Sequence, residues 1–258
     1  MKHRLFPVVF ALLLVLSGCL SAPPSGGGPG ATLNNKKEVP SMKLRIDSPF
    51  IQTGIKLTNL LILNLFWVIG CIPIVTIGAS TIAAFTVTLK MTEGREGLSM
   101  TAQFWSAFAK NLKHGIPLTL ILLAGIWSVW VDWQIFDKVE GNPIGFLILA
   151  LAVIFLLLIH FLYVFPLEAR YDNRLLMNLS NARKLFIRYA GRSLGLVGIL
   201  FLQFLLFTQV NTALIFAGFF CLPILMIYTA SQIAMPIFRQ VEKTGGAAEE
   251  FEITSDLY

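Results

Sequence analysis

The sequence predicts an all-α protein, a polytopic bundle of five to six transmembrane helices with amphipathic helices on the cytoplasmic side. Three observations predict this fold. Of the 258 residues, 56% are hydrophobic and only 13% are charged, and the mean hydropathy is +0.74. Apolar segments long enough to cross a bilayer recur along the chain, since about 20 helical residues span a hydrocarbon core of about 30 Å. Lys and Arg fall in short runs between those segments, where membrane topology places them.

The first 41 residues form a processing unit that differs from the rest of the chain. Residues 1–18 resemble a lipoprotein-type signal peptide, with a basic start, a short apolar core and small residues before Cys19. In this interpretation Cys19 carries a diacylglycerol, and residues 19–41, rich in Pro, Gly and Ser, are a flexible linker. A second candidate start is Met42, which opens a basic stretch. A true lipoprotein leader, a start assigned too early and a start at Met42 are all open alternatives.

Six apolar segments follow the leader, and a helix break separates the first two. Pro73 disfavours helix at the residue before it and Gly78 relaxes the backbone, so residues 71–80 should form a break. Either Thr76 or Ser80 is expected to cap the helix that follows. The expected membrane helices are Ile55–Ile72, Thr76–Met91, Gly115–Val131, Ile144–Pro166, Ser193–Val210 and Asn211–Ile233.

Charge placement predicts the orientation in a bacterial cytoplasmic membrane. Residues 90–114 and 167–192 are basic, whereas residues 132–143 hold three acids and one lysine. Because cytoplasmic loops carry an excess of Lys and Arg, the two basic stretches should be cytoplasmic, together with the carboxyl-terminal tail. A lipidated Cys19 would lie outside. Five crossings therefore fit a lipoprotein, and six fit a start at Met42.

Three blocks of sequence carry a family resemblance. Residues 60–80 read Leu-Leu-Ile-Leu-Asn-Leu-Phe-Trp and, further on, Ile-Pro-Ile-Val-Thr-Ile-Gly-Ala-Ser. Residues 104–112 form an aromatic stretch, and residues 165–184 include Pro-Leu-Glu-Ala-Arg-Tyr-Asp-Asn. These blocks resemble the YesL-like family of integral membrane proteins, a domain of unknown function numbered 624, over residues 42–241. The export leader departs from that family, and residues 242–258 form an acidic polar tail.

The resemblance implies an accessory or scaffold role in carbohydrate uptake. Such proteins are often encoded beside sugar uptake systems of Gram-positive bacteria, so subunits of an ABC-type sugar transporter are the expected partners, in addition to the lipid bilayer and further copies of the chain. The alternatives are a small-solute transporter and a membrane lipoprotein of structural role.

The sequence does not predict an enzyme. It contains no phosphate loop of the form GxxxxGK[ST], no HExxH and no GxSxG. No catalytic, cofactor or metal residue is therefore proposed. A nucleic-acid partner is not expected either, because the net charge of +6 follows the membrane topology.

Two groups of residues are candidates for function. The first group would form a polar site at the membrane midplane of a transporter, because polar groups inside the membrane mark such sites. It comprises Asn64, Thr76, Ser80 and His160. Hydrogen bonding between helices is the alternative role for these side chains. The second would form a cytoplasmic surface for a partner and comprises Trp105, Phe108, Glu168, Arg170, Asp172 and Asn173. Contact with lipid headgroups is the alternative for the stretches that carry this second group.

Overall fold

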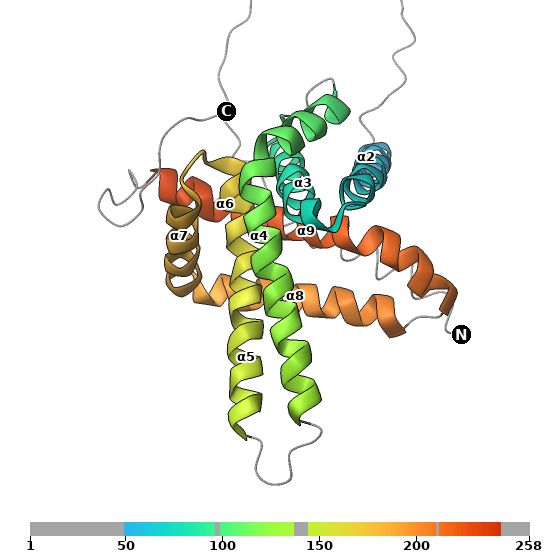
Figure 1. Ribbon diagram of the computed structural model, residues 1–258. Coiled ribbons are helices and arrows are strands. Elements are labelled where there is room, and N and C mark those ends of the chain that lie inside the picture. The colour runs from blue at the N-terminus through green and yellow to red at the C-terminus, as the bar shows by residue number, and fades with distance from the viewer. Residues whose placement is uncertain (1–48, 96–98, 137–143, 210–211, 244–258) are drawn as a thin grey trace, which may run out of the picture. The chain divides into compact units, whose positions relative to one another are not determined.

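The computed structural model describes residues 49–95, 99–136, 144–209 and 212–243. Every regular element in these ranges is helical, which confirms the predicted fold class (Figure 1). The chain divides between Asn59 and Leu60 into two compact units, and the account below concerns the second. The candidate lipidation site Cys19, the candidate start Met42 and the predicted segments 1–18 and 19–41 lie outside the described residues. The helices are α2 (Pro49–Gly70), α3 (Ile77–Thr92), α4 (Met100–Phe136), α5 (Ile144–Ile159), α6 (Phe165–Arg170), α7 (Leu175–Arg188), α8 (Ala190–Gln209) and α9 (Thr212–Lys243).

Five helical segments are long and apolar enough to cross a membrane, and a sixth is added if α7 and α8 count as one bent span. This agrees with the predicted five to six crossings and identifies a multi-pass membrane protein. The angle between α7 and α8 is 95°. The five segments are Thr53–Gly70, Ile74–Thr92, Met100–Phe136, Ile144–Arg170 and Leu222–Lys243.

The predicted helix break is present, but its hydroxyl groups do not cap α3. Helix α2 ends at Gly70, a 3-10 turn covers Ile74–Thr76, and α3 begins at the next residue. The Thr76 hydroxyl donates to the carbonyls of Gly70 and Pro73, at 2.8 and 2.7 Å. The Ser80 hydroxyl donates to the Trp67 carbonyl at 2.9 Å. Both hydroxyls therefore bond carbonyls at the end of α2 and in the α2–α3 connection, and they add to the backbone hydrogen bonds that the Trp67 and Pro73 carbonyls already accept.

Helix α3 lies at the centre of the unit and contacts α4, α6 and α9. Small residues let its backbone touch that of α4. A Cβ atom added at Gly78 would collide with the Gly115 carbonyl, and one added at Gly115 would collide with the backbone of Ala79. The Thr119 hydroxyl accepts from the Gly78 amide at 2.7 Å and donates to the Gly115 carbonyl at 2.9 Å. Such close approach is how helices associate in lipid.

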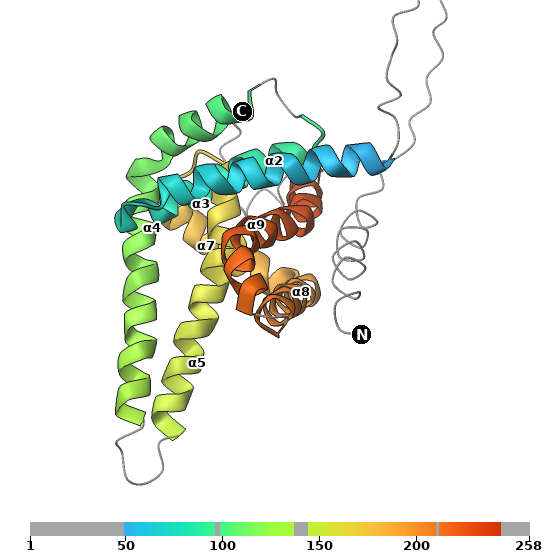
Figure 2. The same cartoon turned by 90° about the vertical axis from the view of Figure 1, so that its right-hand side faces the viewer.

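Several predicted helix boundaries are wrong because the helices are longer than their apolar cores. The membrane helix expected over Gly115–Val131 is part of the 37-residue helix α4, which begins at Met100 and contains Pro117. The helix expected to end at Ile233 continues as α9 to Lys243. The span that begins at Ile144 continues through a π-helical turn, His160–Val164, into α6. Pro166 follows that turn, and because proline has no amide hydrogen the regular pattern of bonds is interrupted there. In both views α4 and α5 run side by side (Figures 1 and 2).

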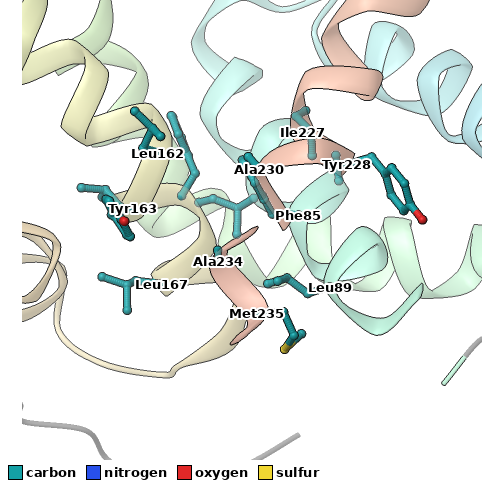
Figure 3. Packing of buried hydrophobic residues seen from close by; sticks show 14 of the residues in the cluster. Phe85, Leu89, Leu162, Tyr163, Leu167, Ile227, Tyr228, Ala230, Ala234 and Met235 are labelled. Atoms are coloured by element: carbon teal, nitrogen blue, oxygen red, sulfur yellow. The ribbon is translucent and has the colours of Figure 1, made fainter. Parts of the chain in front are cut away.

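The core is formed where α3, α9 and the π-helical turn meet (Figure 3). Phe85 and Leu89 of α3 lie near α9, and Leu162 and Tyr163 come from the turn. Polar pairs also join the helices. Thr88 is 2.7 Å from Ser231, Tyr163 is 2.7 Å from Ser193, and Gln203 donates to Thr229 at 2.8 Å. The buried α9 residues drawn with them include Ile227, Tyr228, Ala230, Ala234 and Met235.

Candidate functional site

Arg170, at the end of α6, binds two acidic residues that are distant in the sequence. Its guanidinium donates a hydrogen bond of 2.9 Å to Glu93, at the end of α3. It also donates two hydrogen bonds, of 2.8 and 3.1 Å, to the carboxylate of Glu242 on α9. The Tyr171 hydroxyl donates to the same Glu242 carboxylate at 2.7 Å. Burial and the charge of Glu242 raise the pKa of the Tyr171 phenol, so it remains a donor at neutral pH.

These bonds bring the ends of α3, α6 and α9 to one place, which we call the ion-paired end. The side chain of Glu93 is 7% exposed and that of Arg170 is 11% exposed, so water screens this pair only weakly. The charge pattern of the sequence placed residues 90–114, residues 167–192 and the tail on one side of the membrane. The contacts of Arg170 agree with that placement.

A cavity of about 650 Å³ opens at the ion-paired end, between α3, α4, α6 and the residues that follow α6. Charges of both signs line it. Lys110 lies 3.4 Å from Asp172, and Arg95 lies 2.9 Å from Glu93. The cavity can therefore receive a polar segment or molecule through ion pairs and hydrogen bonds. Its other polar lining residues are Thr86, Lys90, Gln103, Ser106, Asn111, Glu168, Arg170 and Tyr171.

Glu168 is the most deeply buried charged group of the cavity lining, because its side chain is 1% exposed. Its Oε2 atom is 2.9 Å from Nδ1 of His114, on α4. The side chain of Asn178, on α7, also lies beside this carboxylate and acts as a hydrogen-bond donor to it. The buried carboxylate is therefore held by side chains from two neighbouring helices.

The predicted partner residues fall into two places. Glu168, Arg170 and Asp172 line the cavity, and among these Asp172 is exposed. Asn173 is buried beside it and donates to Asn178 at 3.0 Å. Trp105 and Phe108 belong to an aromatic cluster on α4 and α2 that also contains Phe66 and Phe104, and of these Trp105 is exposed.

Four residues at or beside the ion-paired end are not indicated as functional by the sequence. Glu93 and Glu242 lie 77 and 72 positions from Arg170 in the chain, and no local pattern links them. Lys110 and His114 were counted only as topology signals. The weak signal was their spacing, because one helical turn separates them on one face of α4.

The four candidate midplane residues do not form one site through any described contact. Asn64 is buried and its Oδ1 has no partner among the described residues. Thr76 and Ser80 are bonded to carbonyls of the α2–α3 connection. His160 is buried edge-on to Phe165, with ring centroids 5.2 Å apart, and its Nε2 has no partner in the described part of the chain. None of the four lines the cavity at the ion-paired end.

Within the described ranges, no group of three His, Cys, Asp or Glu side chains is placed to hold a metal ion.

Residues 60–133, which run from α2 through most of α4, match a family described as "Protein of unknown function, DUF624". No curated protein and no solved structure matches the chain. The family match and the apolar helices both fit an integral membrane protein, and neither one indicates a biochemical activity.

Proposed function

We propose that this membrane protein is an accessory or scaffold component of carbohydrate uptake, and that it receives a polar segment of an ABC-type transporter subunit in its cavity. The observation that carries the proposal is the cavity itself, about 650 Å³ in volume and lined by charges of both signs. The resemblance to YesL-like proteins of the bacterial cytoplasmic membrane supports the choice of partner. In this proposal the ion-paired end faces the cytoplasm, as the distribution of Lys and Arg favours.

The polar groups inside the helix bundle also support a scaffold rather than a conduit. Thr88 is bonded to Ser231, Gln203 to Thr229 and Trp67 to Thr81, each across a helix–helix contact. These hydrogen bonds between helices stabilise the bundle. A rigid bundle with an open polar cavity at one end is suited to hold a partner in position.

In-cell photo-crosslinking tests the proposed partner. A photoreactive amino acid is placed at Ser106, which is exposed and lines the cavity, and at Ile148 of α5, which is exposed and apolar, as the control. We expect mass spectrometry to identify an ABC permease or ATPase at Ser106 and not at Ile148. Recovery of this chain alone, or of further copies of it, would contradict the proposal.

A filling variant tests the cavity. Ser106→Trp should reduce the copurified transporter subunit at least tenfold, because the indole would occupy the cavity. The control is Thr101→Trp, an exposed position of the same helix that does not line the cavity. Equal copurification with both variants would show that the partner binds elsewhere.

A small-solute transporter is the second candidate. The observation that favours it is the pair of buried atoms without partners in the described residues, Asn64 Oδ1 and His160 Nε2, on helices that could cross the membrane. Proteoliposomes would take up a radiolabelled sugar faster than empty liposomes, and His160→Phe would remove the difference. No uptake above that of empty liposomes would exclude this function for the sugars tested.

A further inference from the structure

We propose that the exposed face of α7 binds the anionic headgroups of phospholipids in the leaflet at the ion-paired end. The proposal is independent of the cavity and of any transporter partner. It rests on the two faces of α7 and on its charge.

One face of α7 fixes the helix to the protein. Asn178, Asn181, Ala182, Leu185 and Phe186 are buried, and α7 contacts the π-helical turn, α5 and α6. The ring of Phe186 packs edge-on against Phe155 and Tyr163, with centroids 5.1 and 6.3 Å apart. Because these contacts fix the rotation of α7 about its axis, they also fix which of its residues lie on the opposite, exposed face.

The opposite face combines basic and large apolar side chains. Leu176 is 79% exposed and Ile187 is 76% exposed, the highest values among the large apolar residues of the described chain. They are three helical turns apart and therefore lie on one line along the helix, with Arg183 between them. Lys184 and Arg188 are also exposed and flank that line. A helix with this pattern lies in the interface, with apolar side chains among the acyl chains and cations at the phosphates.

The charge of this region has one sign. Five basic residues occur within residues 174–192, and no Asp or Glu occurs between Asp172 and Glu242. Among the residues that the structure describes, the acidic residues on neighbouring elements are Glu168 and Asp172, near the start of α7, and Glu242 on α9, which Arg170 binds. Three of the five, Arg183, Lys184 and Arg188, lie on α7 itself, and Arg174 and Arg192 flank it. Clusters of Lys and Arg on or beside an amphipathic helix are typical of a surface for anionic lipids.

Helix α7 makes an angle of 95° with α8 at the break beside Tyr189, so its exposed face ends there and does not continue along α8. The exposed face is less suited to a protein groove, because a docking helix presents adjacent apolar residues at i, i+3, i+4 and i+7. Here the two exposed apolar residues are separated by cations.

The test compares lipid binding by the full chain and two variants with equal charge loss. The first variant is Arg183→Gln with Lys184→Gln and Arg188→Gln. The control carries Lys113→Gln, Arg239→Gln and Lys243→Gln, three exposed positions outside α7. Each protein is purified in neutral detergent with equal amounts of phosphatidylglycerol and phosphatidylcholine of the same chain length. Native mass spectrometry then counts the bound lipids.

We expect the unmodified chain to bind phosphatidylglycerol about fivefold in excess over phosphatidylcholine. The α7 variant should lower this ratio to about one, and the control should keep it. A third variant, Arg183→Lys with Arg188→Lys, keeps the charge and should keep the ratio, which separates lost binding from lost folding. Retained enrichment in the α7 variant, or an equal loss in the control, would overturn the proposal. Inorganic phosphate is added as a competitor, and displacement of the lipid by phosphate alone at millimolar concentration would point to a free-anion site and also overturn it.

Discussion

Helix α5 is strongly apolar but mostly exposed on the surface of the protein, whereas α3 is rich in small residues and mostly buried. The span that begins with α5 is built almost entirely from Leu, Ile, Phe and Ala, yet only 11% of its most apolar stretch is buried in the protein. The span that contains α3 is rich in Gly, Ala, Ser and Thr, and 67% of its most apolar stretch is buried. In lipid, apolar side chains gain little by leaving the surface, whereas small residues allow close helix contact. We therefore interpret α5 as a helix that faces lipid and α3 as a helix that packs against other helices.

The largest expected effect is from a side chain placed at the α3–α4 contact. Gly115→Leu should lower the free energy of unfolding by about 3 to 5 kcal/mol, because the new side chain would meet the Ala79 backbone and separate the helices. Gly145→Leu, on α5, is the control, since nothing lies within 4 Å of a Cβ at that position. Unfolding in SDS, followed by tryptophan fluorescence, measures both. Similar losses would show that α3 is not packed more tightly than α5.

Loss of the arginine at the ion-paired end should have the next largest effect. Arg170→Gln leaves Glu242 without its ion-pair partner and leaves Glu93 with only the exposed Arg95. We expect a loss of about 2 to 3 kcal/mol in the same assay, less than for a fully buried pair because the Glu242 side chain is 29% exposed. Arg192→Gln is the control, because Arg192 is exposed and bonds the neutral Gln240. Adding Glu93→Gln to Arg170→Gln should recover part of the loss. No recovery would indicate that the ion pairs do not act as a unit.

A smaller effect is expected from an interhelical hydrogen bond. Ser231→Ala removes the 2.7 Å bond to Thr88 and should cost about 1 kcal/mol, since Thr88 keeps its bonds to the Ala84 and Phe85 carbonyls. Leu156→Ala deletes more atoms, but Leu156 is 59% exposed and should cost less. A greater loss from Leu156→Ala would mean that α5 packs against protein rather than lipid.

The smallest effect concerns reactivity and leaves stability unchanged. Burial raises the pKa of the Cys71 thiol to about 11, from the usual value of 9.0, so its thiolate fraction at pH 8 should be about a hundredfold lower than that of an exposed thiol. Maleimide labelling is compared in chains that carry Ser at the other cysteines, with Ile72→Cys as the exposed reference. The rate of maleimide labelling of Cys71 should rise about tenfold for each unit by which the pH is raised. Equal rates at pH 8 would contradict the burial of Cys71.

Local patterns in the sequence were sufficient for the helices, the break after α2 and the positive stretches. They were not sufficient for boundaries, because polar residues at the ends of α4 and α9 are stabilised by neighbouring helices rather than by lipid. The candidate residues Glu168, Arg170 and Asp172 line one cavity, but the partners of Arg170 could not be found from spacing. The midplane group was chosen by polarity alone, and its members have separate surroundings.

The sequence by itself determined that the protein is helical and multi-pass, and which stretches between the apolar segments are basic. Hydrophobic length and charge are local properties, so the chain carries them without reference to its fold. Only the tertiary structure decided which helix is central, that Glu93 and Glu242 share Arg170, and that α7 presents Leu176 and Ile187 beside its cations. These features depend on contacts between residues far apart in the chain, which are fixed by packing.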